Sequence, residues 1–176
     1  DTDMLLSVGG DGTFLSASAV VADSGIPVAG VNLGRMGFLS ENRPEDLVQA
    51  LLSEDYTIEN RAMLNVRPAG SAVLPDECRQ ALNEMAVHRN GPSVLEVQVM
   101  IDGICLPSYW ADGLIISTSS GSTAYSLSVG GPIVLPEAKV LIISPIAPHN
   151  LNVRPMVVPD TAEIHLRMTS RDGEFV

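Results

Sequence analysis

Apolar runs alternate with helix-like stretches in the first third of the chain. Residues 4–8 and 27–31 are short apolar runs typical of strands, and the stretch 13–21 between them has the character of a short helix. A second helix is predicted from Pro44, because proline and acidic residues favour the first turn of a helix. Four apolar residues at helical spacing predict its buried face: Leu47, Val48, Leu51 and Leu52. Strands that alternate with helices indicate a parallel sheet.

From about residue 57 the pattern becomes that of a mostly β region. Residues 95–101 alternate apolar and polar side chains, which predicts a half-buried strand, and Asp102-Gly103 is typical of a hairpin turn after it. Apolar runs that predict further strands stand at 114–116, 140–143, 156–158 and 163–168. The first two of these runs are continuous, which favours strands covered on both faces. We therefore divide the chain into an α/β region, residues 1–60, and a β-rich region, residues 61–176.

Glycines follow the first apolar run directly. Residues 9–13 read Gly-Gly-Asp-Gly-Thr, and a second glycine-bearing loop, residues 32–39, follows the second predicted strand. Parallel strands present their carboxyl ends at this edge, where α/β sheets bind ligands. Glycines let backbone N–H groups approach an anion, and a helix N-terminus attracts one. The first loop is therefore either a tight turn or a phosphate-binding loop, in which Asp11 would be mobile and exposed.

Two polar groups stand out in the β-rich region. Residues 117–123 carry six hydroxyl side chains in seven positions, between a buried-type strand and a short helix. They form either a solvated loop or a set of hydroxyl and N–H groups that converge on an anion or a ribose. Asn83 and Glu84 stand side by side in an apolar strand, so their side chains point to opposite faces. They are either a polar strand end with one bonded partner or a pair that contacts ribose hydroxyls or an amide at a domain seam.

Charge limits the classes of partner. The chain holds 10 basic and 21 acidic residues, a net charge of −11, and its only lysine is Lys139. This balance argues against a nucleic-acid surface and against attachment to an anionic membrane, although a few arginines and amides suffice for a local phosphate. No apolar run approaches the ~20 residues of a membrane span, and no secretory pattern is recognisable. Cys78 and Cys105 lack metal-site spacing and predict reduced, partly buried thiols in a cytoplasmic protein.

Five segments in a fixed order resemble the NAD kinases. They are GGDGTFL at 9–15, NLGRMGFL at 32–39, LNEMAV at 82–87, DGLIISTSSGSTAYSLSVGGPI at 112–133 and SPIAPHNLNVRP at 144–155. The first motif is shared with diacylglycerol and sphingosine kinases, but the Asn-Glu pair and the hydroxyl-rich segment separate the NAD kinases from them. The resemblance implies phosphoryl transfer from ATP to the 2′-hydroxyl of the adenosine ribose of NAD, with Mg²⁺ or Mn²⁺. It also implies an α/β domain, whose parallel sheet is incomplete here, followed by a β-sandwich-like domain.

The resemblance implies a role for each matching residue. Asp11 matches the catalytic base, and the residues that match the phosphate-binding loop are Gly9, Gly10, Gly12 and Thr13. The residues that match the NAD site are Gly12, Phe38, Asn83, Glu84, Asp112, Ser120, Thr123, Ala124, Tyr125 and Ser128. In the family an acid at the position of Asp112 reaches the site from a neighbouring subunit, so a homo-oligomer, dimer or tetramer, is implied. No residue is assigned to a metal.

Two features depart from the family pattern. Residues 117–123 read STSSGST, where the family commonly has proline at the position of Ser119, a change that loosens the loop and keeps its hydroxyls. Family members also carry an α/β segment before GGDGT and further elements after the last residue here, so the sequence resembles a fragment. A lipid kinase with the same glycine loop and a non-catalytic NAD-binding or oligomerisation module are the alternative functions.

Overall fold

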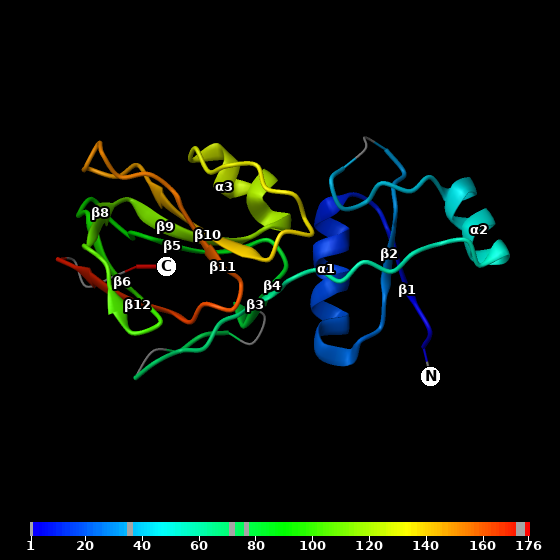
Figure 1. Cartoon of the computed structure of the whole chain (residues 1–176), viewed down its shortest axis with the longest axis horizontal. Helices are drawn as coiled ribbons and strands as arrows, with labels where there is room; N and C mark the ends of the chain where they lie inside the picture. Colours follow the sequence, from blue (N-terminus) through cyan, green and yellow to red (C-terminus); the bar gives the residue numbers. More distant parts are fainter. Residues whose placement is uncertain (1, 35–36, 71–72, 76–77, 172–174) are drawn as a thin grey trace. The chain divides into compact units, whose positions relative to one another are not determined.

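The computed structural model describes residues 2–34, 37–70, 73–75, 78–171 and 175–176. The chain divides into two compact units, Asp1–Asn60 and Arg61–Val176. The first unit combines helices with two strands, and the second is almost entirely β (Figure 1). The division falls where the sequence pattern changes from helical spacing to the period of strands.

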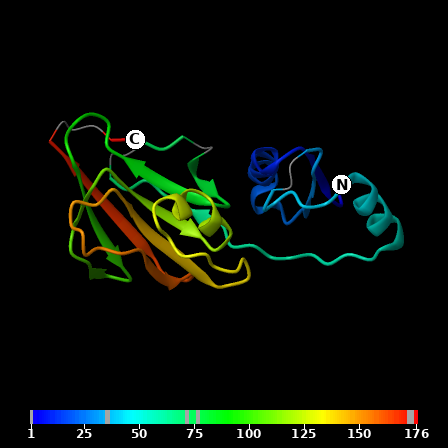
Figure 2. The ribbon, with the colours of Figure 1, turned by 90° about the horizontal axis from the view of Figure 1, so that it is seen from above.

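The first unit is built on two parallel strands, β1 (Leu5–Val8) and β2 (Val28–Val31). Helix α1 (Asp11–Val21) and the 3-10 turn η1 (Ala22–Ser24) form the crossover that parallel strands require. Helix α1 packs against both strands (Figures 1 and 2). The predicted parallel pairing is confirmed, although α1 begins at Asp11, two residues earlier than the pattern predicted.

Helix α2 (Pro44–Ser53) begins with the predicted proline and acidic residues. The prediction of its buried face was wrong in part: Leu47 is buried, whereas Val48 and Leu52 have exposed fractions of 56% and 84%. The sheet of this unit has two strands. So small a sheet offers too little apolar surface to cover both rows of an amphipathic helix.

The second unit contains two four-stranded sheets and a separate pair of short strands. The first sheet has the order β11-β10-β9-β5; the second has the order β12-β6-β7, with β8 also paired to β6. All pairs in these sheets are antiparallel. The strands are β3 (Leu64–Asn65), β4 (Gln80–Ala81), β5 (Glu84–His88), β6 (Leu95–Ile101), β7 (Ile104–Cys105), β8 (Tyr109–Ala111), β9 (Gly113–Thr118), β10 (Val140–Ile146), β11 (Met156–Pro159) and β12 (Ile164–Ser170).

The two four-stranded sheets pack face to face around one hydrophobic core, the arrangement of a β-sandwich (Figures 1 and 2). The second sheet contributes Leu95, Val97 and Val99 from alternate positions of β6, as the period-two pattern predicted. On the other face of the first sheet, Ile115 and Ile142 are fully buried as well. The continuous apolar runs therefore form strands covered on both faces, as predicted.

A helical segment follows β9 and lies over the first sheet (Figure 1). It consists of the 3-10 turn η3 (Ser120–Thr123) and the short helix α3 (Tyr125–Ser128). The hairpin predicted after β6 is confirmed, because Asp102 and Gly103 both have positive φ and connect β6 to β7.

The predicted partial burial of the cysteines was wrong. Cys78 and Cys105 are free and exposed. Cys105 lies in β7, a two-residue strand at the edge of its sheet, where nothing in the described part of the unit covers the side chain. No helix within the described residues is long and apolar enough to cross a membrane.

Candidate functional site

The first glycine loop ends in the first turn of α1. The N–H of Gly9 donates to the carbonyl of Val31 at 2.8 Å, which joins the loop to the end of β2. In the described part of the first unit, no acceptor binds the N–H groups of Gly10, Asp11 and Gly12. A helix N-terminus leaves its first N–H groups without intrahelical partners, and such groups bind anions readily. This end of α1 is therefore a candidate phosphate site.

The glycines of this loop serve two different needs. Gly9 has a φ of 155°, and a Cβ here would lie 2.4 Å from Oγ1 of Thr13, so the chain's own packing requires glycine. At Gly10 and Gly12 a Cβ would meet nothing within 4 Å, and neither residue has a positive φ. The fold gives no internal reason for glycine at these two positions. The space next to their backbone is open among the described residues.

The second glycine loop holds the carboxylate of Asp11. Its Oδ1 accepts the N–H groups of Leu39 (3.0 Å) and Ser40 (3.1 Å), and its Oδ2 accepts that of Phe38 (2.9 Å). The prediction of a mobile side chain was wrong, because the two loops meet at one edge of the sheet. Burial raises the pKa of Asp11, but the three N–H bonds outweigh it and keep this pKa below its ordinary value. Asp11 is therefore ionised at neutral pH.

Further hydrogen bonds tie the two loops together. The hydroxyl of Ser40 donates to the carbonyl of Gly9 at 3.0 Å, and Nδ2 of Asn32 donates to the carbonyl of Ser40 at 2.9 Å. Phe38 has an exposed fraction of 69% and is free to contact a ligand. Two residues of the predicted motif, 35 and 36, lie outside the described residues.

Asn83 and Glu84 lie where the chain passes from one sheet to another. Strand β4 pairs with β3, whereas β5 begins at Glu84 and pairs with β9. The prediction that both residues stand within one strand was wrong, because Asn83 falls between β4 and β5. The carbonyl of Asn83 accepts the N–H of Thr118 at 2.8 Å, and a Cβ on Gly121 would lie 2.2 Å from the same oxygen. Asn83 marks the sheet crossing, the point where the chain passes from β4 to β5. The sheet crossing is thus in direct contact with the hydroxyl-rich segment.

Glu84 has a buried carboxylate oxygen without a partner. The N–H of Tyr125 donates to this carboxylate, but Oε2 has no hydrogen bond within the described structure. Burial raises the pKa of Glu84, and the bond from Tyr125 offsets this only in part. A buried acceptor without a partner is costly and rare in folded proteins. Glu84 is therefore a candidate ligand contact.

The hydroxyl-rich segment divides into fastened and unpartnered side chains. Ser119 donates to the carbonyl of Pro136 at 2.8 Å, and the hydroxyl of Ser122 exchanges hydrogen bonds with the carbonyl and N–H of Val134, both at 3.1 Å. These side chains are buried, so they are part of the fold rather than a solvated loop. Ser120 is also buried, yet its Oγ has no partner among the described residues. It joins Glu84 as a candidate ligand contact.

The predicted site residues that follow Ser120 are at least partly exposed: Thr123, Ala124, Tyr125 and Ser128. The ring of Tyr125 stacks on that of His88, with 5.7 Å between centroids and 12° between planes. The sequence reasoning missed His88. The signal was present, because Glu84 and His88 stand four positions apart on one strand and so share a face.

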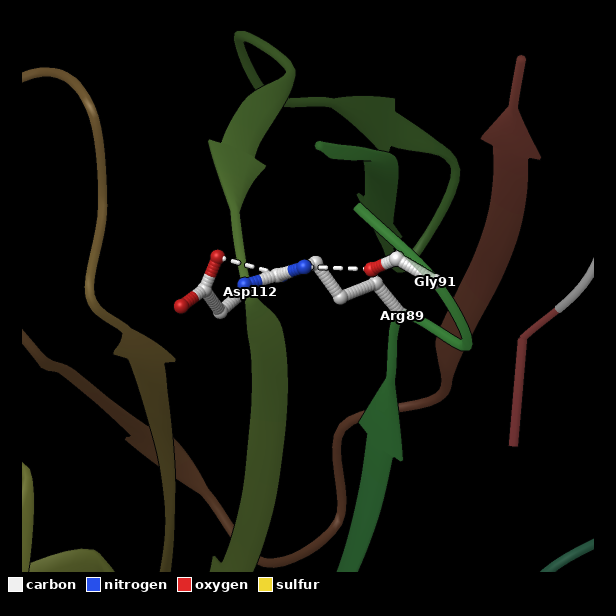
Figure 3. A network of polar contacts seen from close by, with 3 residues as sticks. All are labelled: Arg89, Gly91 and Asp112. Carbon is white, nitrogen blue, oxygen red and sulfur yellow. Dashed lines mark hydrogen bonds and ion pairs between the residues drawn. The ribbon is translucent and has the colours of Figure 1, made fainter. Parts of the chain in front are cut away.

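Asp112 lies at the other end of β9 from Ser120. It precedes the six residues of that strand and Ser120 follows them, so about 20 Å of extended chain separates the two, at ~3.4 Å a residue. Oδ1 of Asp112 accepts a hydrogen bond from Nε of Arg89 at 2.7 Å, and Arg89 also binds the carbonyl of Gly91 (Figure 3). Both charged side chains are more than one-third exposed. Ion pairs of this kind add little to stability, so Asp112 is easily released to another partner.

The donor set for a divalent metal is sparse. Within the described ranges, no three histidine, cysteine, aspartate or glutamate side chains come together as a metal site. Mg²⁺ commonly keeps several waters and binds one or two carboxylates together with substrate phosphates. These residues therefore fit a metal that arrives on a phosphorylated substrate rather than one held by the protein alone.

Two family models match the chain. The N-terminal unit is matched at residues 1–54 by the ATP-NAD kinase N-terminal domain. Residues 82–176, more than half of the chain, are matched by the ATP-NAD kinase C-terminal domain. The chain belongs to the NAD kinase family. Both glycine loops, the Asn-Glu pair and the hydroxyl-rich segment fall within the matched ranges.

Curated NAD kinases are similar to the chain over nearly all of its residues. The NAD kinase of Flavobacterium psychrophilum is 47% identical over 99% of this chain and 60% of its own length. The NAD kinase of Bacteroides fragilis is 45% identical over all of this chain and 61% of its own length. The chain thus spans about 60% of the length of these relatives.

Solved structures of the NAD kinase family share the fold. A yeast NADH kinase complexed with NADH has a TM-score of 0.80 and 31% identity, over 98% of this chain and 54% of that one. An NAD kinase from Archaeoglobus fulgidus in complex with ATP has a TM-score of 0.77 and 31% identity, over 99% of this chain and 70% of that one. The predicted fold class, an α/β region followed by a β-rich, sandwich-like domain, is confirmed.

Proposed function

We propose that this chain carries the catalytic and NAD-binding parts of an NAD kinase. The reaction transfers the γ-phosphoryl group of ATP to the 2′-hydroxyl of the adenosine ribose of NAD and yields NADP and ADP. The observation that carries the proposal is family membership in both units, with relatives named NAD kinase that align over nearly the whole chain. The choice of substrates is supported by the two neighbours, one complexed with NADH and one with ATP.

In the proposed step Asp11 accepts the proton of the 2′-hydroxyl. The ribose oxygen forms a bond to the γ-phosphorus while the bond from that phosphorus to the oxygen of ADP breaks. A carboxylate offers about four acceptor positions, and the three N–H bonds leave one on Oδ2 for the hydroxyl. An ionised, fixed carboxylate suits phosphoryl transfer, in which the protein mainly positions the reactants and stabilises charge.

We assign substrate phosphates to the beginning of α1. The unpartnered N–H groups of Gly10, Asp11 and Gly12 and the space beside the two glycines support this assignment. Gly9 and Thr13 shape the loop, because a side chain at Gly9 would collide with Thr13. Mg²⁺ or Mn²⁺ would accompany ATP here as the counter-ion of its phosphates.

We assign NAD to the cluster formed by the sheet crossing and the hydroxyl-rich segment. Oε2 of Glu84 and Oγ of Ser120 are buried and lack partners, so a ligand with hydroxyl or amide groups would satisfy them. Tyr125, stacked on His88, adds an aromatic surface. The remaining residues of the proposed NAD site are Gly12, Phe38, Asn83, Asp112, Thr123, Ala124 and Ser128.

We further infer a cytoplasmic homo-oligomer, dimer or tetramer, in which Asp112 of a neighbouring copy completes the NAD site. In its own chain Asp112 lies at the end of β9 remote from Ser120, and its carboxylate pairs with Arg89. The side chain of Asp112 is more than one-third exposed, which supports its assignment to the site of a neighbouring copy.

The proposal is tested by NADP formation. The chain, together with any sequence that flanks it in its natural protein, is incubated with Mg²⁺ and NAD, and NADP is measured with a coupled dehydrogenase. ATP, inorganic polyphosphate and NADH are compared as alternative substrates. Formation of NADP supports the proposal. Phosphorylation of diacylglycerol or sphingosine without NADP would identify a lipid kinase, and NAD binding without any transfer would identify a non-catalytic module.

Asp11→Asn should separate binding from transfer. We expect turnover to fall by roughly 10²–10⁴-fold, the range for loss of a general base, while calorimetry still detects NAD binding. Asp46→Asn is the matched control, because Asp46 is an exposed acid in the first turn of α2 and should leave turnover unchanged. Near-normal turnover of Asp11→Asn would contradict the role of Asp11 as the base.

A further inference from the structure

Three consecutive amides fix the direction of the Asp11 carboxylate. Oδ1 accepts two N–H bonds, from Leu39 and Ser40, and Oδ2 accepts one, from Phe38. Both acceptor positions of Oδ1 are therefore filled, and Oδ2 keeps one. Rotation of the carboxylate would break all three bonds together. The orientation of the remaining acceptor position is thus set by the backbone of residues 38–40.

The residue before these amides has no room for a side chain. A Cβ at Gly37 would lie 2.1 Å from Oδ1 of Asp11, 2.6 Å from its Cγ and 2.8 Å from its Oδ2. All three distances are below any ordinary contact, and all three atoms belong to one carboxylate group. Space for the carboxylate is the reason for glycine that the structure supplies.

The loop after Gly37 is poorly able to move away from a larger side chain. Ser40 is fully buried, and its hydroxyl donates to the carbonyl of Gly9 at 3.0 Å. Its own carbonyl accepts Nδ2 of Asn32 at 2.9 Å. Residue 40 is thus fixed at two points, so we expect a methyl group at residue 37 to displace the carboxylate of Asp11.

We propose that Gly37 is a positioning residue for phosphoryl transfer: the space that it leaves lets the amides of 38–40 hold Asp11 with one acceptor position directed at the substrate hydroxyl. The inference rests on the proposed function and on Asp11 as its base. It extends that function to a residue that touches neither substrate. A group that only orients the base affects the transfer step and leaves the binding of NAD to other residues unchanged.

Gly37→Ala tests the inference, with Gly34→Ala as the matched control. Both substitutions add one methyl group to the same loop, but a Cβ on Gly34 would meet no described residue within 4 Å. We expect kcat of Gly37→Ala to fall roughly 10- to 100-fold, because a misplacement of about 1 Å is worth up to ~10²-fold in rate. KM for NAD should stay within about twofold, since uniform binding is untouched. Gly34→Ala should keep both constants.

The outcomes separate this inference from the function on which it rests. Failure of the unsubstituted protein to form NADP would overturn the proposed function. If that protein is active, a wild-type kcat for Gly37→Ala overturns the inference, and so does a raised KM for NAD with an unchanged kcat.

A variant that changes the orientation of the base without added volume is Ser40→Ala, which removes the hydrogen bond to Gly9.

Ser40→Ala keeps the experiment decisive if circular dichroism shows that Gly37→Ala does not fold. Ser40→Ala removes the hydrogen bond from the Ser40 hydroxyl to the carbonyl of Gly9. Its loss should loosen the amides that hold Asp11, so kcat should fall while KM for NAD stays within about twofold. An unchanged kcat in folded Ser40→Ala would overturn the inference.

Discussion

At the scale of single residues, two carboxylates of this chain have pKa values displaced in opposite directions. Burial acts to raise both, but three backbone N–H bonds outweigh it at Asp11 and lower its pKa, whereas one such bond at Glu84 does not. Environments that separate the pKa values of two acids are typical of sites where the acids have different tasks. Asp11 is kept ionised next to the candidate phosphate site, and Glu84 has a buried carboxylate oxygen without a partner among the described residues.

The raised pKa of Glu84 predicts a pH dependence of stability. In the folded protein its pKa lies above the ordinary value of 4.5, so the folded state binds a proton more readily than the unfolded state. The contribution of Glu84 to the free energy of unfolding is therefore fully present below its ordinary pKa. This contribution is lost as pH rises through the pKa that Glu84 has in the folded protein. Glu84→Gln does not titrate, so its free energy of unfolding relative to wild type should increase as pH rises above 4.5 and through the raised pKa of Glu84.

Urea unfolding at several pH values measures this difference. Glu137→Gln is the control, because Glu137 is an exposed acid of the same unit and its substitution should change the free energy of unfolding by no more than about 0.5 kcal/mol. A difference between Glu84→Gln and wild type that stays constant with pH would contradict the burial of the Glu84 carboxylate in solution.

At the scale of elements, the hydroxyl-rich segment is fastened over the first sheet by side-chain to backbone bonds. Ser119 and Ser122 reach the backbone of Pro136 and Val134, and the hydroxyls of Ser126 and Ser144 lie 3.1 Å apart. These bonds hold η3 and the four-residue α3, which is too short to be stable alone. The Oγ of Ser120 has no partner among the described residues, and the hydrogen-bonded serines on either side, Ser119 and Ser122, hold Ser120 in place.

Ser122→Ala should therefore destabilise the fold. The substitution leaves the half-buried N–H and carbonyl of Val134 without their hydroxyl partner. An unsatisfied buried group costs about 1–3 kcal/mol, so partial burial places the cost near the lower end of this range. We expect a loss of at least ~1 kcal/mol in the free energy of unfolding, measured with urea. Ser128→Ala is the control, since Ser128 is exposed and its change should stay within about 0.5 kcal/mol. Equal stability of the two variants would contradict the fastening role of Ser122.

The sequence predicted the elements better than it predicted the surroundings of single side chains. The alternation of apolar and polar residues located β6, and apolar runs located β9, β10, β1 and β2, because burial on one face or on both faces imposes these patterns. It failed for Val48 and Leu52, since the same pattern arises whether or not a partner surface is present. Serines show no period, so which hydroxyls bind the backbone and which remain unpartnered is decided only by the loops that pack beside them.

At the scale of the whole molecule, the proposed functional residues are found in both units. Asp11 and the phosphate loop belong to the first unit, and Glu84, Ser120 and Asp112 belong to the second. The motifs could be assigned from the sequence because they follow one another in the same order as in the NAD kinase family. The restraint of Asp11 by residues 38–40 could not, because it depends on two loops 27 residues apart that meet in space.

Mixing two inactive variants tests whether copies share a site. We expect Asp112→Asn to lose activity through weaker NAD binding, as Asp11→Asn does through slow transfer. If Asp112 serves a neighbouring copy, a mixed dimer of the two variants contains one intact site. Random reassembly of equal amounts then restores roughly a quarter of wild-type activity per subunit, since about half of the dimers are mixed. Reassembly is followed by native mass measurement, and no recovery in mixed oligomers would contradict the shared site.

The open space at Gly12 has a consequence for how this chain tolerates mutation. Gly12 stands in the first turn of α1, where alanine would favour the helix by up to about 1 kcal/mol, and nothing in the described fold obstructs a methyl group there. A screen for thermal resistance would therefore select alanine at this position. Under the proposed function, a screen for NADP production should reject it. Glycine at residue 12 would then be a stability deficit that selection for a bound ligand maintains.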